Sequence, residues 1–284
     1  MKRLTGEYSK SALCRVLGVA RSTVCRASKK RPARDLSDLK ERVLNELCVC
    51  PGYGFRRMHA HLKRKGISAS RGDLRNVYKE LNLLKRRART RVQTTNSKHK
   101  YPRHPNLMHS LSIERPDQVW AADVTYLKIL TRYAYLALLM DVFTRRIVGW
   151  ALSLANDTAL TVSALEVALS LGRSPEIHHG DLGANYSCND YIKRLKARGI
   201  QISMAAAGAP YENGYAERLN RTIKEEEIRL GDYRDLQDAS TGIEAFIARY
   251  NHERIHSSIS YRTPSEVFEE WMTKNTRGTP SHST

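Results

Sequence analysis

Apolar positions near the start of the chain follow helical spacing. Leu13, Val16 and Leu17 mark one short helix, Gly18 allows a turn, and residues 22–26 begin a second helix. Two short helices joined by a tight turn are typical of a helix-turn-helix unit. A plain helical hairpin has the same pattern and is the alternative interpretation.

A second helical pair is predicted over residues 53–84. Met58 and Leu62 lie four residues apart on one helix, and Ser70 is a favourable N-cap for the next, with Asp73 at its third position. The apolar stripe of the second helix falls at i, i+3, i+4 and i+7 and consists of Leu74, Val77, Tyr78 and Leu81. We interpret this pair as a second helix-turn-helix.

From residue 115 the pattern changes to β-rich apolar runs. Three runs, over 119–129, 133–143 and 146–152, are separated by short turns and predict an antiparallel meander. The elements expected after them are a helix over 158–171, a strand over 176–181, a basic helix over 187–198, a strand over 200–205, a helix over 213–230 and two further helices, the last starting at Thr263-Pro264. This order predicts an α/β domain in which helices flank a mixed five-stranded sheet.

These patterns divide the chain into five expected segments. They are a first helix-turn-helix over 1–34, a second over 35–84, a basic linker over 85–113, an α/β core with C-terminal helices over 114–273, and a disordered tail over 274–284. The linker has almost no apolar periodicity, which suits a segment that follows a phosphate backbone.

The charge is divided unevenly between these segments. The formal net charge is +19, which points to a polyanionic partner. Residues 1–110 carry 28 Lys and Arg against 7 Asp and Glu, whereas residues 111–284 carry 20 and 22. We therefore expect the N-terminal part to bind DNA. The side chains predicted to contact DNA there are Arg21, Arg26, Arg56, Arg57, Arg71, Arg75, Lys85, Arg86 and Arg87.

Cysteine usage and hydropathy indicate in which cellular compartment the protein is expected. Five scattered cysteines argue against a disulfide framework and favour a reducing cytosol. Cys48 and Cys50 precede His59 and His61, but this spacing fits no standard zinc finger. No signal peptide or apolar run of membrane length is found, so we expect a cytoplasmic protein without a membrane partner.

Three acidic residues stand out in the predicted core. Asp123 lies within the strand VWAADVTYL, where a buried carboxylate needs a partner or a metal. Asp181 ends the strand EIHHGD, and Glu217 follows in a helix after 35 intervening residues. Each acid alone is more often an edge or surface group, and only the joint pattern is specific.

Such a trio suits phosphoryl transfer on DNA. Two hard divalent ions can bind the scissile phosphate and activate the attacking oxygen, and Mg²⁺ prefers oxygen ligands such as Asp and Glu. Arg221 and Lys224 follow Glu217 at i+4 and i+7, share its helix face, and are predicted to contact the DNA backbone beside the metals.

At this point the residues resemble a known family. The stretch from RPDQVWAADVTYL to YNHERIHSSISYRTPSEVF resembles the retroviral-integrase-like core of insertion-sequence transposases, in particular the OrfB proteins of the family typified by insertion sequence three. The segments CRVLGVARSTV and YGFRRMHAHLKRKGI resemble that family's start and its second helix-turn-helix. The resemblance implies a ribonuclease-H-like fold and a DDE triad at Asp123, Asp181 and Glu217. The family usually has Ser or Thr before the second Asp and Gln after it, where this chain has Gly180 and Leu182.

The resemblance also implies an activity and partners. The enzyme would hydrolyse one strand at the element end, and the freed 3′-OH would attack another phosphodiester with no covalent protein–DNA intermediate. The triad would hold two Mg²⁺ ions, with Mn²⁺ as a substitute. The expected partners are double-stranded DNA (terminal inverted repeats and target), further copies in a homo-oligomer, and an upstream OrfA protein or fusion, in the nucleoid of a bacterial cytoplasm.

Two other functions compete with this hypothesis. A regulator with two helix-turn-helix units would explain the basic N-terminal part but not the acids of the core. A structure-selective nuclease on the same fold would cleave DNA without joining it.

Overall fold

The computed structural model describes residues 9–16, 18, 20, 35–84, 100–109, 111–130, 132–206 and 208–276. It forms two compact units, Met1–Arg42 and Val43–Thr284. In the first unit, α1 spans Lys10–Val16, where a helix is predicted. The expected second helix at 22–26 lies outside the described residues, as do most of the linker and of the tail.

The described residues between α1 and the sheet contain α3 (Ser37–Val49), α4 (Phe55–Arg64) and α5 (Arg71–Glu80). The last two confirm the predicted helical pair, and Ser70 Oγ accepts a 3.0 Å hydrogen bond from the backbone N–H of Asp73, as a helix N-cap does. Helix α3 is not predicted by the apolar pattern of the sequence. Val43 is the one fully buried side chain of that helix, so its apolar stripe is thin.

The sheet has five strands: β1 (Val119–Ile129), β2 (Arg132–Asp141), β3 (Ile147–Ser153), β4 (Ile177–Gly180) and β5 (Gln201–Met204). Their order is β3-β2-β1-β4-β5. The first three strands pair antiparallel, and β4 pairs parallel to both β1 and β5. The predicted meander and mixed sheet are therefore confirmed.

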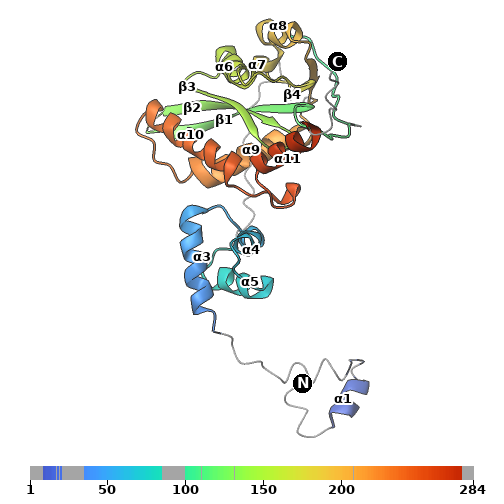
Figure 1. Ribbon diagram of the computed structural model, residues 1–284, viewed down its shortest axis with the longest axis vertical. Helices are drawn as coiled ribbons and strands as arrows, with labels where there is room; N and C mark the ends of the chain where they lie inside the picture. Colours follow the sequence, from blue (N-terminus) through green and yellow to red (C-terminus); the bar gives the residue numbers. More distant parts are fainter. Residues whose placement is uncertain are drawn as a thin grey trace, which may run out of the picture. The chain divides into compact units, whose positions relative to one another are not determined.

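Helices cover both faces of this sheet (Figure 1). One face carries α6 (Thr158–Leu169), α7 (Ala184–Ser187) and α8 (Asn189–Ala197). The other carries α9 (Gly214–Ile223), α10 (Leu236–His252) and α11 (Pro264–Thr276). This is the ribonuclease-H-like arrangement expected from the sequence, and the chain is an α/β protein.

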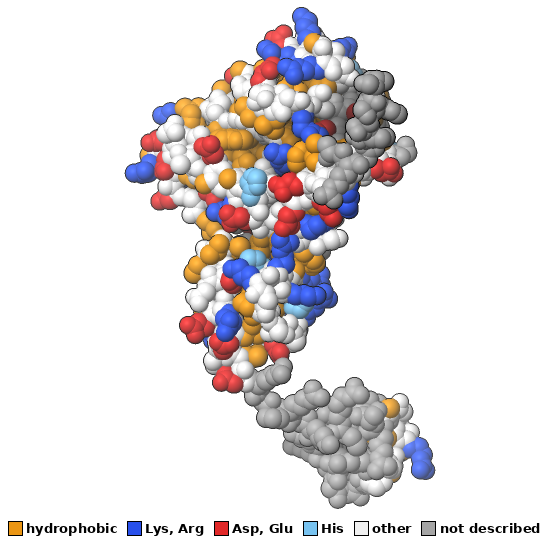
Figure 2. Space-filling view, viewed as in Figure 1, with side chains coloured by type: hydrophobic (Ala, Val, Ile, Leu, Met, Phe, Trp, Pro, Cys, Tyr) orange, Lys and Arg blue, Asp and Glu red, His pale blue; other side chains and the backbone are white. Residues whose placement is uncertain are grey.

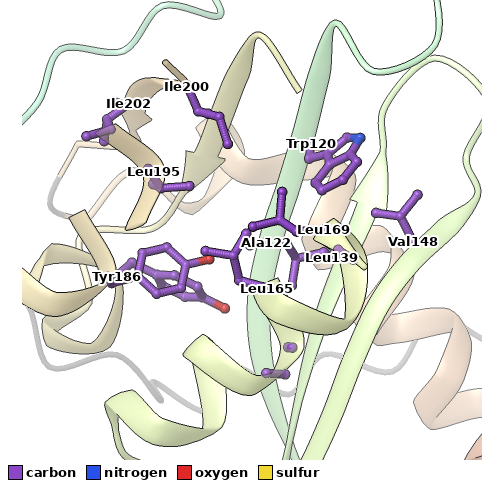
Figure 3. Close-up of a cluster of buried hydrophobic side chains, with 14 of the residues drawn as sticks. Trp120, Ala122, Leu139, Val148, Leu165, Leu169, Tyr186, Leu195, Ile200 and Ile202 are labelled. Atoms are coloured by element: carbon purple, nitrogen blue, oxygen red, sulfur yellow. The ribbon is translucent and has the colours of Figure 1, made fainter. Parts of the chain in front are cut away.

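Alternating side chains of the central strands build two cores. Trp120, Leu139 and Leu165 belong to the core beneath α6 (Figure 3), whereas Leu138, Leu219 and Phe246 belong to the core beneath α9 and α10. The approach of α6 to β3 is close. A Cβ added at Gly149 would lie 2.4 Å from the carbonyl oxygen of Ala164, so this strand position requires glycine.

Two predicted helices differ in detail. The helix expected over 187–198 is broken at Cys188, whose ψ of 152° is extended. The helix expected over 213–230 starts as a 3₁₀ turn at Pro210–Asn213, continues as α9 and widens into a π-helical turn, η2, over Lys224–Ile228. Such π turns often occur at functional sites.

The last helix starts where the sequence predicts. The backbone N–H of Thr263 donates to Glu266 Oε2 at 2.8 Å, and that of Glu266 donates to Thr263 Oγ1 at 3.2 Å, which is a capping box. None of the helices in the described ranges is long and apolar enough to cross a membrane.

Candidate active site

Asp123 lies midway along β1 with its carboxylate held at both oxygens. Oδ1 accepts a 2.8 Å hydrogen bond from the backbone N–H of Val124, and Oδ2 accepts one of 2.8 Å from Asn220 Nδ2. Burial, together with the charges of Asp181 and Glu217, raises the pKa of Asp123 to about 7 in spite of these hydrogen bonds, which lower it. The three predicted carboxylates are therefore close enough for the charges of Asp181 and Glu217 to act on Asp123.

Asp181 directly follows β4, at the C-terminal end of that strand. Its Oδ1 accepts a 3.0 Å hydrogen bond from the backbone N–H of Gly183. A Cβ at Gly183 would lie 2.8 Å from the same oxygen, so glycine lets the loop fold tightly around the carboxylate. Leu182, one of the two departures from the family pattern, is buried in the core beneath α6 and therefore packs as an apolar residue.

Glu217 sits in the first turn of α9, between two asparagines that fix this helix to β1. Asn213 Nδ2 donates to the carbonyl oxygen of Ala122 at 3.0 Å, and Asn220 bonds Asp123 as described. Glu217 is four residues after the first asparagine and three before the second, so all three share one helix face. The Oδ1 atoms of Asn213 and Asn220 are buried without a hydrogen-bond partner among the described residues.

Neither asparagine was predicted as a site residue. Their spacing around Glu217 was visible, but an asparagine in a helix is usually a surface group, and nothing in the sequence shows that β1 lies beneath it. The signal that would have found them is the i, i+4, i+7 pattern of polar residues on one face of an otherwise amphipathic helix.

The donor set fits a hard divalent cation. All three carboxylates offer oxygen ligands, and their mutual repulsion at Asp123 would be relieved by positive charge. As they stand, no group of three or more His, Cys, Asp or Glu side chains within the described ranges is arranged to hold a metal ion. The charges of Asp181 and Glu217 act on Asp123, but the three side chains do not form a coordination shell in the described part of the chain.

Lys224 and Arg221 extend the same side of the helix. The ammonium of Lys224 lies 4.2 Å from the centroid of the Tyr126 ring, and burial lowers its pKa while the charge of Asp123 opposes that shift. Lys224 is thus close enough to Asp123 for the charge of that carboxylate to act on it. Arg221 is exposed.

The N-terminal side chains that are predicted to contact DNA differ from one another in their exposure. Arg56, Arg71 and Arg75 are exposed on α4 and α5. Arg57 is partly buried, and its Nη1 lies 3.3 Å from Glu226 Oε1. Arg21, Arg26, Lys85, Arg86 and Arg87 lie outside the described residues. All of these DNA contacts stay predictions.

The Cys and His residues considered for zinc are also placed. Cys48 is exposed and Cys50 partly buried, and His61 Nε2 lies 2.7 Å from Glu46 Oε2. They form no metal-binding group in the part of the chain that the structure describes.

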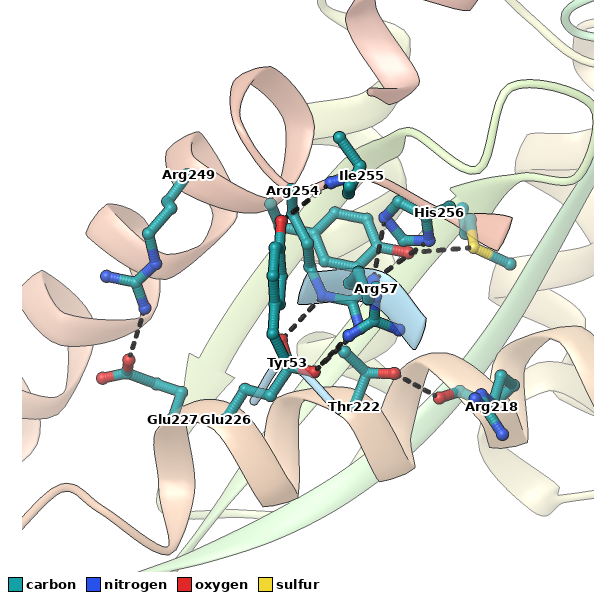
Figure 4. A network of polar contacts seen from close by, with 12 residues as sticks. Tyr53, Arg57, Arg218, Thr222, Glu226, Glu227, Arg249, Arg254, Ile255 and His256 are labelled. Atoms are coloured by element: carbon teal, nitrogen blue, oxygen red, sulfur yellow. Dashed lines mark hydrogen bonds and ion pairs between the residues drawn. The ribbon is translucent and has the colours of Figure 1, made fainter. Parts of the chain in front are cut away.

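A buried polar network joins α4 to the helix that carries Glu217 (Figure 4). Arg254 Nε and Nη2 donate to the two carboxylate oxygens of Glu226, in η2, at 2.7 and 2.8 Å. Tyr53, just before α4, accepts a 3.0 Å hydrogen bond at its hydroxyl from the backbone N–H of Ile255. A Cβ at Gly52 would lie 2.1 Å from Glu226 Cγ. The sequence did not predict this contact.

Lys and Arg side chains also gather on the core itself. Figure 2 shows them over α8, where Lys193, Arg194, Lys196 and Arg198 are exposed, as the predicted basic helix requires. The core therefore has positive surface of its own although residues 111–284 carry a small negative net charge.

The sheet order and the flanking helices are those of an integrase core domain. Residues 113–210 and 198–264 match two family models, each described as an integrase core domain. The chain is 30% identical over 279 residues to the transposase for insertion sequence element IS629 of Shigella sonnei, which covers 94% of each chain. It belongs to the insertion-sequence transposases, a class of polynucleotidyl transferases.

Two other relatives agree with this family. A 31 kDa protein of insertion element IS600 from Shigella sonnei is 33% identical over 268 residues, covering 91% of this chain and 98% of that protein. Transposase InsF for insertion sequence IS3A from Escherichia coli (strain K12) is 30% identical over 275 residues, covering 93% and 94%. The resemblance drawn from the sequence motifs is confirmed.

Solved structures of viral integrases are more distant. The HTLV-2 integrase catalytic core domain in complex with magnesium, in its trimeric form, is 20% identical with a TM-score of 0.45, covering 54% of this chain and 97% of that chain. The simian T-cell lymphotropic virus intasome in complex with PP2A regulatory subunit B56 gamma is 16% identical with a TM-score of 0.49, covering 81% and 77%.

Proposed function

We propose that this chain binds the ends of an insertion sequence, cleaves one DNA strand by metal-assisted hydrolysis, and joins the freed 3′-OH to another phosphodiester by direct transesterification. The observation that carries the proposal is that the charges of Asp181 and Glu217 act on Asp123, whose carboxylate accepts a hydrogen bond from Asn220. The family gives the class of enzyme, and these side chains give the chemistry.

Asp123, Asp181 and Glu217 would hold two Mg²⁺ ions, with Mn²⁺ as a substitute. Bound divalent ions would polarise the phosphodiester and lower the pKa of the attacking hydroxyl or water. The residues around the acids orient them: Asn220 fixes one oxygen of Asp123, and the Gly183 N–H fixes one of Asp181. Lys224 and Arg221 would contact the DNA backbone next to the reacting phosphate.

Each chemical step breaks one P–O bond and forms another; the first leaves a 3′-OH and a phosphate monoester, and the second forms a new phosphodiester. In the first, water adds to the phosphorus at the element end, the bond to the 3′ oxygen breaks, and that oxygen takes a proton. In the second, the 3′-OH loses its proton and forms a new bond to a target phosphorus while the target's own 3′ oxygen leaves. Neither step requires a nucleophile from the protein.

The remaining parts would recruit partners. The two helix-turn-helix modules and the basic linker would bind double-stranded DNA at the terminal inverted repeats and the target. Two ends must be brought together, so a homo-oligomer is proposed, with an OrfA partner or fusion upstream. The proposed location is the nucleoid of a bacterial cytoplasm.

The test is an incubation of the full chain with a labelled element-end duplex and a supercoiled target plasmid, with Mg²⁺ or with EDTA. Labelled plasmid formed only with Mg²⁺ is the expected result. Cleavage of the duplex without labelled plasmid would favour a nuclease, and binding without cleavage would favour a regulator. Either of those outcomes would overturn the proposal.

A further inference from the structure

A cavity of about 770 Å³ lies on the side of α9 that faces away from Glu217. An α-helix turns by roughly 100° per residue, so Tyr215 and Thr222, which line the cavity, are far around α9 from Glu217. The turn after β2, the segment before β1 and the loop after α10 supply other walls. None of the three carboxylates lines the cavity, so it is distinct from the candidate active site.

The cavity is rich in positive charge. Its described lining includes the arginines Arg57, Arg145, Arg218 and Arg254, against a single acid, Glu212. Glu226 sits beside the cavity and compensates Arg57 and Arg254. Arg145 and Arg218 form no ion pair with any acid of the described residues, so no carboxylate there compensates their charge.

The positive charge of these arginines acts on the other titratable groups of the cavity wall. Burial, together with the charges of Arg254, Arg57, Arg145 and Arg218, lowers the pKa of His256 to about 2. Glu212, the one acid of the described lining, has partners of its own: its Oε2 accepts hydrogen bonds from Asn106 Nδ2 at 2.9 Å and from the backbone N–H of Ala206 at 2.7 Å, and its Oε1 lies 3.4 Å from His109 Nε2. The chemistry of the cavity is therefore that of an anion site.

Arg145 is the key cation. Its Nε and Nη1 are buried without a hydrogen-bond partner in the described part of the chain, and a buried guanidinium normally has its N–H groups satisfied. The residue has a φ of 69°, in the left-handed region that a non-glycine residue seldom adopts. The turn is held by Asp141, which accepts a 2.9 Å hydrogen bond from the backbone N–H of Thr144. The turn therefore holds Arg145 in place, and the N–H groups at its Nε and Nη1 are available to bind a ligand.

Aromatic rings lie beside these guanidinium groups. The Arg145 guanidinium lies 4.4 Å from the centroid of the Tyr215 ring. Tyr215 is 38% exposed, and Tyr211, one turn earlier, is 77% exposed. Arginine donors next to exposed aromatic faces are the combination that binds unpaired nucleotides, because the guanidinium contacts the phosphate and the ring stacks on the base. An acidic peptide would use the arginines but would have no need of the rings.

We propose that this cavity binds one nucleotide of unpaired DNA, with its phosphate on Arg145 and Arg218 and its base against Tyr211 and Tyr215. The inference rests on the proposed function, since the unpaired strand would belong to the DNA substrate. Strand cleavage and joining expose such nucleotides next to α9, and the cavity would hold one of them while Glu217 acts on the other face of the helix.

The test is photocrosslinking of the full chain, without metal, to a single-stranded oligothymidylate that carries one 5-iododeoxyuridine, followed by mass spectrometry of the linked peptides. We expect links at Tyr211 or Tyr215. Losing a charged hydrogen bond should lower their yield about tenfold in Arg145→Gln and in Arg218→Gln. Arg198→Gln, which removes an exposed arginine at the end of α8, should keep the wild-type yield.

Folding and non-specific binding are controlled separately. Arg218 is exposed, so its variant keeps the fold even if Arg145→Gln shifts the thermal unfolding midpoint. Links confined to other peptides would overturn the inference. So would displacement of the tyrosine links by oligoglutamate as readily as by unlabelled oligothymidylate. Links at the tyrosines without strand joining would refute the proposed function alone, and joining without those links would refute the cavity alone.

Discussion

Asn220 Nδ2 donates a 2.8 Å hydrogen bond to Oδ2 of Asp123. The bond joins α9, which carries the proposed catalytic residue Glu217, to β1, which carries Asp123. Asn220 and Asp123 are 97 positions apart in the chain. Because Asn220 is itself buried, the bond fixes both the orientation of the carboxylate and the position of α9 over β1. Asn220 is therefore a positioning residue.

Replacing that amide should slow the chemistry. Groups that orient a metal-binding carboxylate typically contribute about 10–100-fold to activity, and we expect a loss of this size in the cleavage rate of Asn220→Ala. The affinity for element-end DNA should not change. Single-turnover kinetics and a binding titration separate the two effects. Asn275→Ala, which removes an exposed asparagine of α11, is the matched control. Equal rates in both variants would refute the positioning role.

The charge on Asp123 should destabilise the metal-free protein above neutral pH. Its pKa is raised from 3.8 to about 7, so the folded state binds a proton that the unfolded state releases between these values. The stability of the wild type should fall across this window relative to Asp123→Asn. Thermal unfolding in EDTA should show a higher midpoint for the variant at pH 8 and equal midpoints near pH 3. A variant that is less stable than the wild type at pH 8 would contradict the raised pKa of Asp123.

Glu226 should be essential to the contact between α4 and the core. Glu226→Gln would leave two arginines, Arg57 and Arg254, without their shared buried carboxylate, and breaking a buried ion pair costs about 3–5 kcal/mol. The thermal midpoint should fall clearly. Glu270→Gln, at an exposed pair with Arg262, should have little effect. Similar midpoints for the two variants would show that the network does not stabilise the fold.

Gly183 should be required for activity and not for folding. In Gly183→Ala the new Cβ would lie 2.8 Å from Asp181 Oδ1 and must displace that carboxylate. A misplaced catalytic group costs about 10–100-fold, and we expect a loss of that order in strand cleavage with an unchanged circular dichroism spectrum. Gly54→Ala adds a methyl group with no atom within 4 Å and should cleave like the wild type. Full activity of Gly183→Ala would place Asp181 outside the reaction.

The contrast between these residues shows what sequence could predict. The strands, the capped helices at Ser70 and Thr263, and the spacing of the three acids follow from local periodicity and from motif order. They were predicted because each depends on neighbours in the chain or on a resemblance that preserves their order.

The features that were missed depend on distant partners. Asn220 gains its role from a strand about a hundred residues earlier, and Glu226 from arginines on both sides of it in the sequence. Arg145 has the sequence context of an ordinary charged turn. Its burial and unsatisfied donors follow only from the packing of α9 against that turn. The break at Cys188 and the π turn after α9 likewise have no local signal.

The most direct test of the central claim is the single-turnover rate of strand cleavage with Mg²⁺ in Asp181→Asn and Glu217→Gln. Residues that act as a unit give large losses singly, so each rate should fall by about 10³-fold or more while DNA binding is retained. Glu244→Gln, at an exposed glutamate of α10, should cleave at the wild-type rate. Wild-type rates in Asp181→Asn or Glu217→Gln would contradict the assignment of the chemistry to these carboxylates.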